Sequence, residues 1–387
     1  MNGTGFRASF RREYGYLARS PWDLALLTWL PLLLCGLIAW QLSAGVLRDL
    51  PVVLVDQDGS AIGRDLAIRI EAAPGLALVA HVPDMRAAER LVRAKRAYAA
   101  VLLPPDTARR ALAGQAPVIL YYNASYSAAA ATVQREAAAV IDAANARMAV
   151  ERIAAIAPPG SVRAAPVRAV TSIAWNAPGS QEQQLVSLLH PALLHLLFML
   201  ALVSAFGREL RDGTAGEWSP GMGGAALGAL AGKAMPYLAV FMLWAVLVTG
   251  WLAGVRGWQI AGSWGLLMLG WLLMYLAYLG VALLLVGVTR TMSQALSLTG
   301  IYAGASFAFA GAIFPLDQAS GFARLWGHIL PFTHFARLLA RTWIADAPWA
   351  AAMLPMLAML AIALVTGVPG AILYRRAAAD PASWGRR

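Results

Sequence analysis

The class of the fold is decided by one uncharged stretch, Ser263–Val288, which reads SWGLLMLGWLLMYLAYLGVALLLVGV. A helix rises 1.5 Å per residue, so about 20 apolar residues cross a hydrocarbon core of about 30 Å. This stretch exceeds that length and contains no Asp, Glu, Lys or Arg. We therefore expect it to be a transmembrane helix.

Five more segments of the chain share this length and apolar composition. Apart from Asp23 near the start of the first, none contains Asp, Glu, Lys or Arg, and one such charge at the centre of a span costs about 2.5–3.5 kcal/mol. The five are Trp22–Leu42, Leu185–Phe206, Ala234–Gly254, Ala295–Pro315 and Trp349–Tyr374. The sequence thus predicts a polytopic α-helical membrane protein with six transmembrane helices.

Composition supports this class and argues against others. Of 387 residues, 59% are hydrophobic and 13% charged, against about 25% charged in typical soluble domains. The net charge is +11, but no basic run is interleaved with aromatic residues, so nucleic acid is not an expected partner. Cys35 is the one cysteine, so no disulfide can form within a single chain.

The positive charges predict the orientation. With the N-terminus inside the cell, twelve Lys and Arg residues fall in cytoplasmic segments and four in the short outer loops, in accord with the positive-inside rule. We expect a multi-pass protein of the bacterial inner membrane with both termini in the cytoplasm. The expected parts are a cytoplasmic amphipathic segment 1–21, the first transmembrane helix 22–45, an extracytoplasmic domain and linker 46–184, transmembrane helices two to six in 185–375, and a cytoplasmic tail 376–387. Within 185–375, we expect a cytoplasmic coupling segment 207–233 and an outer loop 316–348.

The N-terminal segment carries Phe6, Phe10, Tyr14 and Leu17 at helical spacing. This spacing predicts an amphipathic helix lying on the inner leaflet. A cleaved signal peptide is the alternative for the first apolar stretch, but about twenty residues precede it and it is longer than a typical signal core. An uncleaved signal anchor is therefore favoured.

Residues 46–184 break the membrane pattern and predict a small α/β domain after the first transmembrane helix. We expect strands at 51–56, 76–82, 98–103 and 118–122, alternating with helices at 60–71, 84–96 and 127–156 and one short helix after residue 106. Asp56, Asp58 and Ser60 are compatible with a calcium loop, but the spacing lacks the remaining ligands. A turn followed by a helix cap is favoured there, and residues 157–184 are expected to form a linker.

Several short segments resemble one family. Arg208–Glu217, which reads RELRDGTAGE, resembles the R-E-x-x-x-G-T segment of ABC-2 type permeases, and it falls in the expected cytoplasmic loop. Further segments resemble that family in the same order along the chain: Val53–Ser60, Gly232-Lys233, Pro236-Tyr237, Thr289–Ala295, Gly311–Leu316 and Leu330–His334. The ordered series resembles the branch with a large external domain between the first two spans. The chain departs from the family pattern at Trp218–Gly224 and at Ala310.

The resemblance implies contact between the cytoplasmic segment and a separate ATPase. The residues it implies for ATPase coupling are Arg208, Glu209, Arg211, Gly213, Thr214 and Glu217. It also implies cytoplasmic ABC ATPase subunits as partners, a homodimer or a heterodimer with a related permease, and an extracytoplasmic domain that receives cargo or docks a periplasmic adaptor protein. An ordinary polar loop is the alternative reading of the same residues.

Three glycines form a double G-x-x-x-G pattern at Gly224, Gly228 and Gly232. This pattern predicts close helix packing at an internal or dimer interface, and a flexible entry to the third span is the alternative. The segment Gly228–Ala234 mimics a phosphate-binding loop, but it is one residue short and lacks the Ser or Thr that holds magnesium. We therefore expect no cofactor in this chain, with ATP and Mg²⁺ bound by the partner ATPase.

Four histidines, His190, His195, His328 and His334, lie in or near apolar segments. A zinc site or a proton relay is one interpretation, and neutral hydrogen-bonded rings are favoured. With no catalytic residues and no metal ligands assigned, we expect a permease of an ATP-driven exporter that moves a hydrophobic or amphiphilic substrate. The alternative is a polytopic membrane enzyme or accessory protein acting on a lipid-linked substrate.

Overall fold

The computed structural model describes residues 5–112, 118–123, 126–156, 180, 182–215, 226–258, 260–311, 316–344 and 348–385. The chain forms two compact units. The inserted domain comprises Ala44–Gln181, and the membrane unit combines Met1–Ser43 with Glu182–Arg387.

The inserted domain is built on a four-stranded sheet with the strand order β2-β1-β3-β4. Strand β1 (Leu50–Asp56) pairs in parallel with β2 (Leu76–Val82) and with β3 (Ala99–Leu103), whereas β4 (Ile119–Tyr122) pairs antiparallel with β3. In the parallel register, Val53 lies opposite Ala80 on one side and Ala100 on the other.

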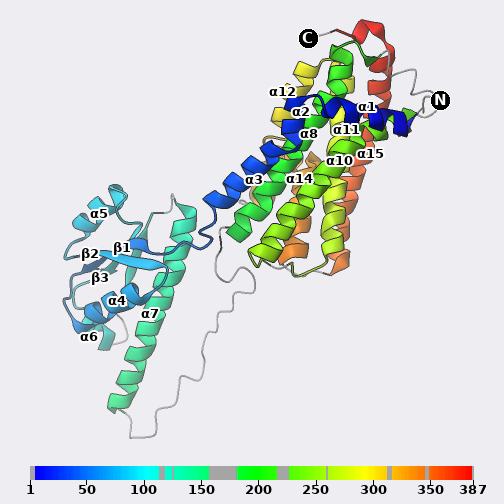
Figure 1. Ribbon diagram of the computed structural model, residues 1–387. Coiled ribbons are helices and arrows are strands. Elements are labelled where there is room, and N and C mark those ends of the chain that lie inside the picture. Colours follow the sequence, from blue (N-terminus) through cyan, green and yellow to red (C-terminus); the bar gives the residue numbers. More distant parts are fainter. Residues whose placement is uncertain are drawn as a thin grey trace. The chain divides into compact units, whose positions relative to one another are not determined.

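Helices cover both faces of this sheet (Figure 1). Val52 and Leu54 pack against α4 (Ala61–Ala72) and α7 (Ser127–Ile156), and Val53 and Val55 pack against α5 (Met85–Arg93). Successive side chains of a strand point to opposite faces, so a strand covered on both sides is apolar throughout. The short α6 (Thr107–Leu112) lies between β3 and β4 in the chain.

The strands and helices predicted for this domain are confirmed to within a few residues at their ends. The turn after β1 is also confirmed. Asp56 Oδ1 accepts the backbone N–H groups of Asp58 and Gly59, and Ser60 caps α4 through the N–H of Ile62. The Asp58 carboxylate accepts the backbone N–H of Ala108. Its hydrogen bonds, first with Ser60 and then with the backbone near Ala108, lower the pKa of the Asp58 carboxyl. Most of the predicted linker lies outside the described residues.

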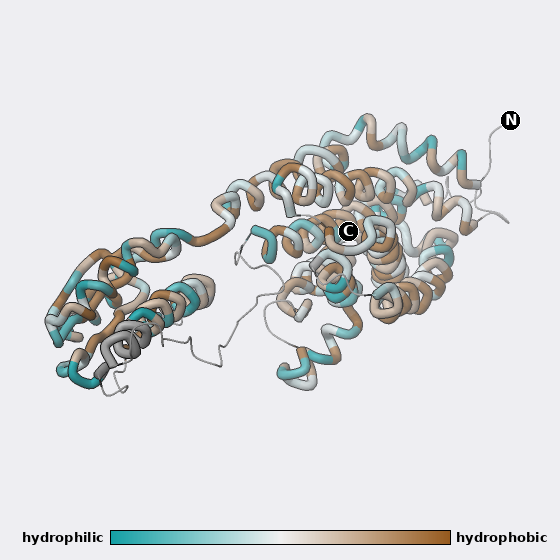
Figure 2. Tube along the Cα trace, turned by 90° about the horizontal axis from the view of Figure 1, so that it is seen from below, coloured by the Kyte–Doolittle hydropathy of each residue, from teal (hydrophilic) through white to brown (hydrophobic). Residues whose placement is uncertain are grey.

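Within the described residues, the membrane unit contains five helical segments long and apolar enough to cross a membrane: Pro21–Gln41, Glu182–Arg211, Ala226–Val255, Trp264–Thr289 and Trp349–Ala379. In Figure 2 hydrophobic colour runs along these helices, whereas the inserted domain mixes both colours. The segments comprise α2 (Pro21–Leu27) with α3 (Trp29–Gln41), η1 (Glu182–Val186) with α8 (Ser187–Arg211), α10 (Ala226–Gly250) with η3 (Trp251–Val255), α11 (Trp264–Thr289) and α15 (Trp349–Ala379). The other helices that the structure describes in this unit are α1 (Phe6–Leu17), α12 (Met292–Tyr302), η4 (Leu316–Gln318), α13 (Gly321–Ile329), α14 (Pro331–Leu339), η5 (Ala340–Ile344) and η6 (Pro381–Ser383).

Helix α8 is the most buried of the five spans and packs against α3, α10, α11 and α12. The most extensive helix pair is α11 with α15, and glycines permit its close approach. A Cβ on Gly280 would lie 2.6 Å from Thr366 Oγ1, and one on Gly287 would lie 2.8 Å from Leu373 Cβ. Small residues at such crossings let two backbones pack closely within a membrane.

The first span is broken at Thr28, between α2 and α3. Pro31 has no N–H group, so it cannot bond the carbonyl four residues earlier, that of Leu27. The indole Nε1–H of Trp244 donates to that carbonyl at 2.8 Å. The carbonyl left without a backbone partner at the break is therefore hydrogen-bonded by a side chain of α10.

The predicted count of six spans is not confirmed, because Ala295–Pro315 does not form a helix of spanning length in its described part. Helix α12 ends at Tyr302, and residues 303–310 continue as successive turns joined by i→i−3 hydrogen bonds. Glycine costs about 1 kcal/mol relative to alanine in a helix, and this stretch contains Gly300, Gly304 and Gly311, the last at φ 72°. Within the predicted outer loop, α14 is almost wholly buried and packs on α11 and α15.

Candidate functional site

The C-terminal end of α8 directs its charged residues into the protein. Arg208 is 3% exposed and Glu209 is 4% exposed. Helix α8 then stops at Arg211, and Gly213 adopts a left-handed conformation with φ 71°, which favours glycine. This turn brings the Thr214 hydroxyl back to Glu209, to which it donates at 2.6 Å.

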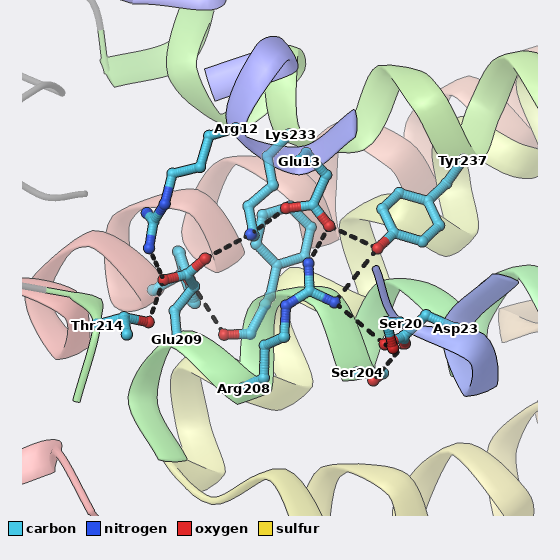
Figure 3. Close-up of polar contacts among 12 residues, drawn as sticks. Arg12, Glu13, Ser20, Asp23, Ser204, Arg208, Glu209, Thr214, Lys233 and Tyr237 are labelled. Atoms are coloured by element: carbon cyan, nitrogen blue, oxygen red, sulfur yellow. Dashed lines mark hydrogen bonds and ion pairs between the residues drawn. The ribbon is translucent and has the colours of Figure 1, made fainter. Parts of the chain in front are cut away.

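Glu13 of α1 lies at the centre of a buried ion-pair network, defined here as Arg12, Glu13, Asp23, Arg208, Glu209 and Lys233 (Figure 3). Glu13 is 2% exposed. One of its oxygens accepts from Arg208 and from the Tyr237 hydroxyl, the latter at 2.6 Å. The other accepts from Lys233 Nζ at 2.6 Å. One carboxylate therefore joins α1 to both α8 and α10.

Lys233 bridges the two glutamates, because its Nζ also donates to Glu209 Oε1 at 2.7 Å. The other oxygen of Glu209 accepts from Arg12 at 3.0 Å as well as from Thr214. In Figure 3 the Lys233 side chain extends between the two carboxylates. Glu209 is thus held by α1, by α10 and by the turn that follows its own helix.

Arg208 extends the network to α2. Its guanidinium lies 3.7 Å from Asp23 Oδ2 and stacks 3.5 Å from the centre of the Tyr16 ring. Asp23 in turn accepts from Ser20 at 2.7 Å and from Ser204 at 3.2 Å. Every carboxylate of the network therefore has several donors.

The charges of the network balance, since three carboxylates (Glu13, Asp23, Glu209) face three cations (Arg12, Arg208, Lys233). Desolvating an ion costs several kcal/mol, which is recovered only when the partners and hydrogen bonds are complete. Removing one member of such a pair costs about 3–5 kcal/mol, because it leaves an uncompensated buried charge. The arrangement therefore fixes four helices, α1, α2, α8 and α10, in one relative position.

The C-terminal segment reaches the same end of α8. The backbone N–H of Gly385 donates to the carbonyl of Leu210 at 2.9 Å. Arg290, which ends α11 in a left-handed conformation, pairs with Asp380 at 3.3 Å. Helix α1 and the C-terminal residues 380–385 thus lie at one end of the membrane unit.

The structure brings together three of the residues predicted for ATPase coupling, Arg208, Glu209 and Thr214, but it buries the two charged ones within the chain. Arg211 remains exposed and pairs with its neighbour Asp212 at 2.7 Å. Gly213 forms the turn between them and Thr214. Glu217 lies outside the described residues.

Sequence reasoning missed Glu13 as a partner of Arg208 and Glu209. The available signal is that Glu13 is the one acidic residue in the otherwise basic segment 1–21. The buried face of α1 comprises Ser9, Glu13 and Leu17, whereas Tyr14 is 66% exposed. Because α1 directs Ser9 and Glu13 at the protein, the side chains of Phe6 and Tyr14 face outward.

The glycines predicted for helix packing lie against α1. A Cβ on Gly232 would be 3.0 Å from the Phe6 carbonyl carbon and closer still to its oxygen, whereas one on Gly228 would meet Phe6 N at 3.6 Å. Gly232 of α10 therefore lies in close contact with the backbone of α1, and Gly224 lies outside the described residues.

The four histidines are hydrogen-bonded to backbone carbonyls, as favoured from the sequence. His195 lies 2.8 Å from Pro191 O and stacks between Tyr278 and Phe332. His190 bonds to Cys35 O at 3.1 Å, and His334 bonds to His328 O at 2.9 Å. Among the described residues, no three His, Cys, Asp or Glu side chains are grouped to hold a metal ion.

Comparison with known proteins places this geometry in context. The model of one protein family, described as ABC-2 family transporter protein, matches residues 21–372. No curated protein matches the chain.

Proposed function

This chain belongs to the ABC-2 family of transporter proteins, and from that premise we propose that it is the membrane-spanning permease of an ATP-driven exporter. Family membership and the five apolar helices make it a multi-pass membrane subunit of a transporter. The proposed cargo is a hydrophobic or amphiphilic molecule that leaves the cytoplasm or the inner leaflet. The proposed location is the bacterial inner membrane, with both termini cytoplasmic.

The buried ion-pair network is the observation that supports this proposal most strongly. It ties α1, α2, α8 and α10 together at the end of the unit where the turn after Arg211 emerges. A force applied to this turn is transmitted to several spans at once, because packed interfaces shift as rigid elements and do not deform continuously. Such a joint suits a subunit moved by an external motor.

We place the contact with the motor on the exposed part of this end. Arg211 and Asp212 are exposed, whereas Arg208 and Glu209 act inside the chain by holding the turn and α1 in place. Glu217 completes the proposed coupling segment. In this arrangement the motor presses on the turn, and the network carries the displacement into the spans.

The motor in this proposal is a pair of cytoplasmic ABC ATPase subunits, which bind ATP and Mg²⁺. Two copies of this chain, or this chain and a related permease, enclose the transport path between them. The inserted domain, on the opposite side of the membrane, receives cargo or docks a periplasmic adaptor protein.

The test is co-purification of the tagged full chain with the ATPase encoded beside it, followed by assay of ATP hydrolysis. We expect a stable complex, and we expect Arg211→Glu to reduce the captured ATPase at least tenfold, because a close charge pair at an interface contributes about 1.5 kcal/mol or more. The matched control is Arg93→Glu. This substitution makes the same charge change at an exposed ion pair of the inserted domain and is expected to leave capture unchanged.

Two results would contradict the proposal. One is failure of the unaltered chain to capture any ATPase. The other is equal capture by Arg211→Glu and by the unaltered chain, which would remove the proposed contact surface.

A further inference from the structure

Helix α1 carries two exposed cations that the ion-pair network does not use. Of its three arginines, Arg12 pairs with Glu209. The other two, Arg7 and Arg11, are exposed, and their guanidinium groups pair with no carboxylate among the described residues. Residues four apart are neighbours on one face of a helix, so these two charges lie side by side.

The burial of Glu13 leaves this face with positive charge alone. Glu13 is the one acidic residue of the segment 1–21, and it is 2% exposed because Arg208 and Lys233 hold it inside. No carboxylate of α1 is therefore left at the surface to offset Arg7 and Arg11.

Aromatic side chains surround the two arginines. Phe6 and Phe10 stack with 6.1 Å between their ring centroids, and Tyr14 is 66% exposed. Trp22, at the start of the first span, is 81% exposed. Exposed Tyr and Trp are typical of the head-group layer of a membrane, where one end of the ring is apolar and the other is wet.

The position of α1 keeps it at the boundary of the bilayer. Only residues 18–20 separate it from α2, with which the first span begins. In Figure 1 α1 runs crosswise to the spans at one end of the membrane unit. A basic helix with aromatic residues that lies along a membrane surface gains binding energy from anionic lipids.

We propose that the exposed face of α1 binds anionic phospholipids, with Arg7 and Arg11 donating to the head-group phosphates and Tyr14 lying beside them at the level of the head groups. A guanidinium group matches two phosphate oxygens at once. An anionic lipid also supplies the net negative charge that this face lacks, which a zwitterionic lipid does not.

This binding requires a membrane but no ATPase and no cargo, so it stands or fails separately from the proposed function. An acidic surface of the ATPase is the rival occupant. It would match the two cations, but it would leave the exposed Tyr14 and Trp22 unexplained.

The test measures which lipids collect beside α1 of the full chain in nanodiscs. A fluorescent label is placed at Ala18→Cys, an exposed position on the same helix face as Arg7 and Arg11, and Cys35 is buried and is not expected to react. Phosphatidylglycerol or phosphatidylcholine that carries a nitroxide near the head group is added at equal mole fractions to a phosphatidylcholine bilayer. Quenching of the label then reports the local enrichment of each lipid.

We expect the association of phosphatidylglycerol at the label to exceed that of phosphatidylcholine roughly tenfold or more, because each arginine near an anionic surface contributes about fivefold. Raising the salt concentration from about 0.1 M to about 1 M shortens the screening length from about 10 Å to about 3 Å. The preference is therefore expected to fall to less than half.

One double variant and one matched control sharpen the test. Arg7→Gln with Arg11→Gln removes both charges and is expected to reduce the preference to less than about twofold. Arg86→Gln with Arg90→Gln makes the same change at the same spacing on α5, an exposed helix of the inserted domain without aromatic residues, and leaves the preference unchanged.

Equal quenching by the two lipids on the unaltered chain, or an undiminished preference in the Arg7→Gln, Arg11→Gln chain, overturns the proposal. If this variant keeps its lipid preference and captures less ATPase than the unaltered chain, the face belongs to the ATPase. Loss of the preference in this variant, with the Arg86→Gln, Arg90→Gln chain unchanged, supports the lipid site whether or not an ATPase is captured.

Discussion

At the end of the membrane unit that holds α1, five buried charged side chains and the partly exposed Arg12 are joined in one network, and each carboxylate has several donors. At the end that holds Ser43, one ion pair, Arg256 with Glu182, lies beside a pocket with a largely apolar wall. At the first end, every charge of the network has at least one partner of opposite charge. At the second end, open space remains beside the ion pair.

The charged end is consistent with the coupling role proposed for it. A joint that passes on motion is served by polar networks that are fully satisfied, since these fix a single arrangement. Each prediction below tests one side of this contrast.

The largest effect is expected from Glu13→Gln at the crowded end. The substitution leaves Arg208 and Lys233 buried with one counter-charge fewer, so we expect unfolding free energy to fall by about 3–5 kcal/mol. Denaturant unfolding of the purified chain in detergent measures it. Glu89→Gln is the control, because it neutralises a carboxylate that is half exposed, and a shift below about 0.5 kcal/mol is expected. Equal shifts for the two variants would show that the network does not hold the helices.

Glu182→Gln makes the same change at the other end and is expected to cost less. Glu182 is buried, but the side chain of Arg256 is 35% exposed and can turn toward water. We expect a loss of about 1–3 kcal/mol, measured by the same unfolding transition. Asp212→Asn, at an exposed pair with Arg211, serves as the control with a shift below about 0.5 kcal/mol. A loss as large as that of Glu13→Gln would remove the contrast between the two ends.

The contrast also marks what the sequence can and cannot predict. The strands of the inserted domain and most of the spans can be predicted from local patterns, because alternating strands and helices and long apolar runs are visible in consecutive residues. The contact of Glu13 with Lys233 joins residues 220 apart, and no local pattern encodes it. Only the isolation of one acidic residue among basic ones points to a partner elsewhere.

The unconfirmed sixth span shows the limit of hydropathy. Ala295–Pro315 is as free of charge as the other spans, but apolar composition does not distinguish a continuous helix from successive turns buried in protein. The glycines at 300, 304 and 311 are the local signal that weighs against a continuous helix. In the same way, Gly280 and Gly287 of α11 mark a close helix pair that the G-x-x-x-G pattern did not include.

A smaller effect is expected where α1 meets α10. Gly232→Ala places a methyl group against the Phe6 backbone, and this overpacking is expected to cost about 1–2 kcal/mol. Gly228→Ala is the matched control, since its Cβ would make an ordinary contact at 3.6 Å; it should be neutral or slightly stabilising, because alanine favours a helix. Protease sensitivity of the first twenty residues provides a second measurement. Equal behaviour of the two variants would show that α1 does not depend on this close approach.

The smallest effect is expected from Gly36→Leu at the open end. The added side chain enters empty space and replaces a helical glycine, so stability should stay the same or rise by up to about 1 kcal/mol. Gly300→Leu, equally open and outside the pocket wall, should behave alike in the same unfolding measurement. A loss above about 2 kcal/mol in Gly36→Leu alone would mean that α3 packs tightly there. In that event the pocket end would be as constrained as the ion-pair end, and the division of the unit into a rigid joint and an open end would fail.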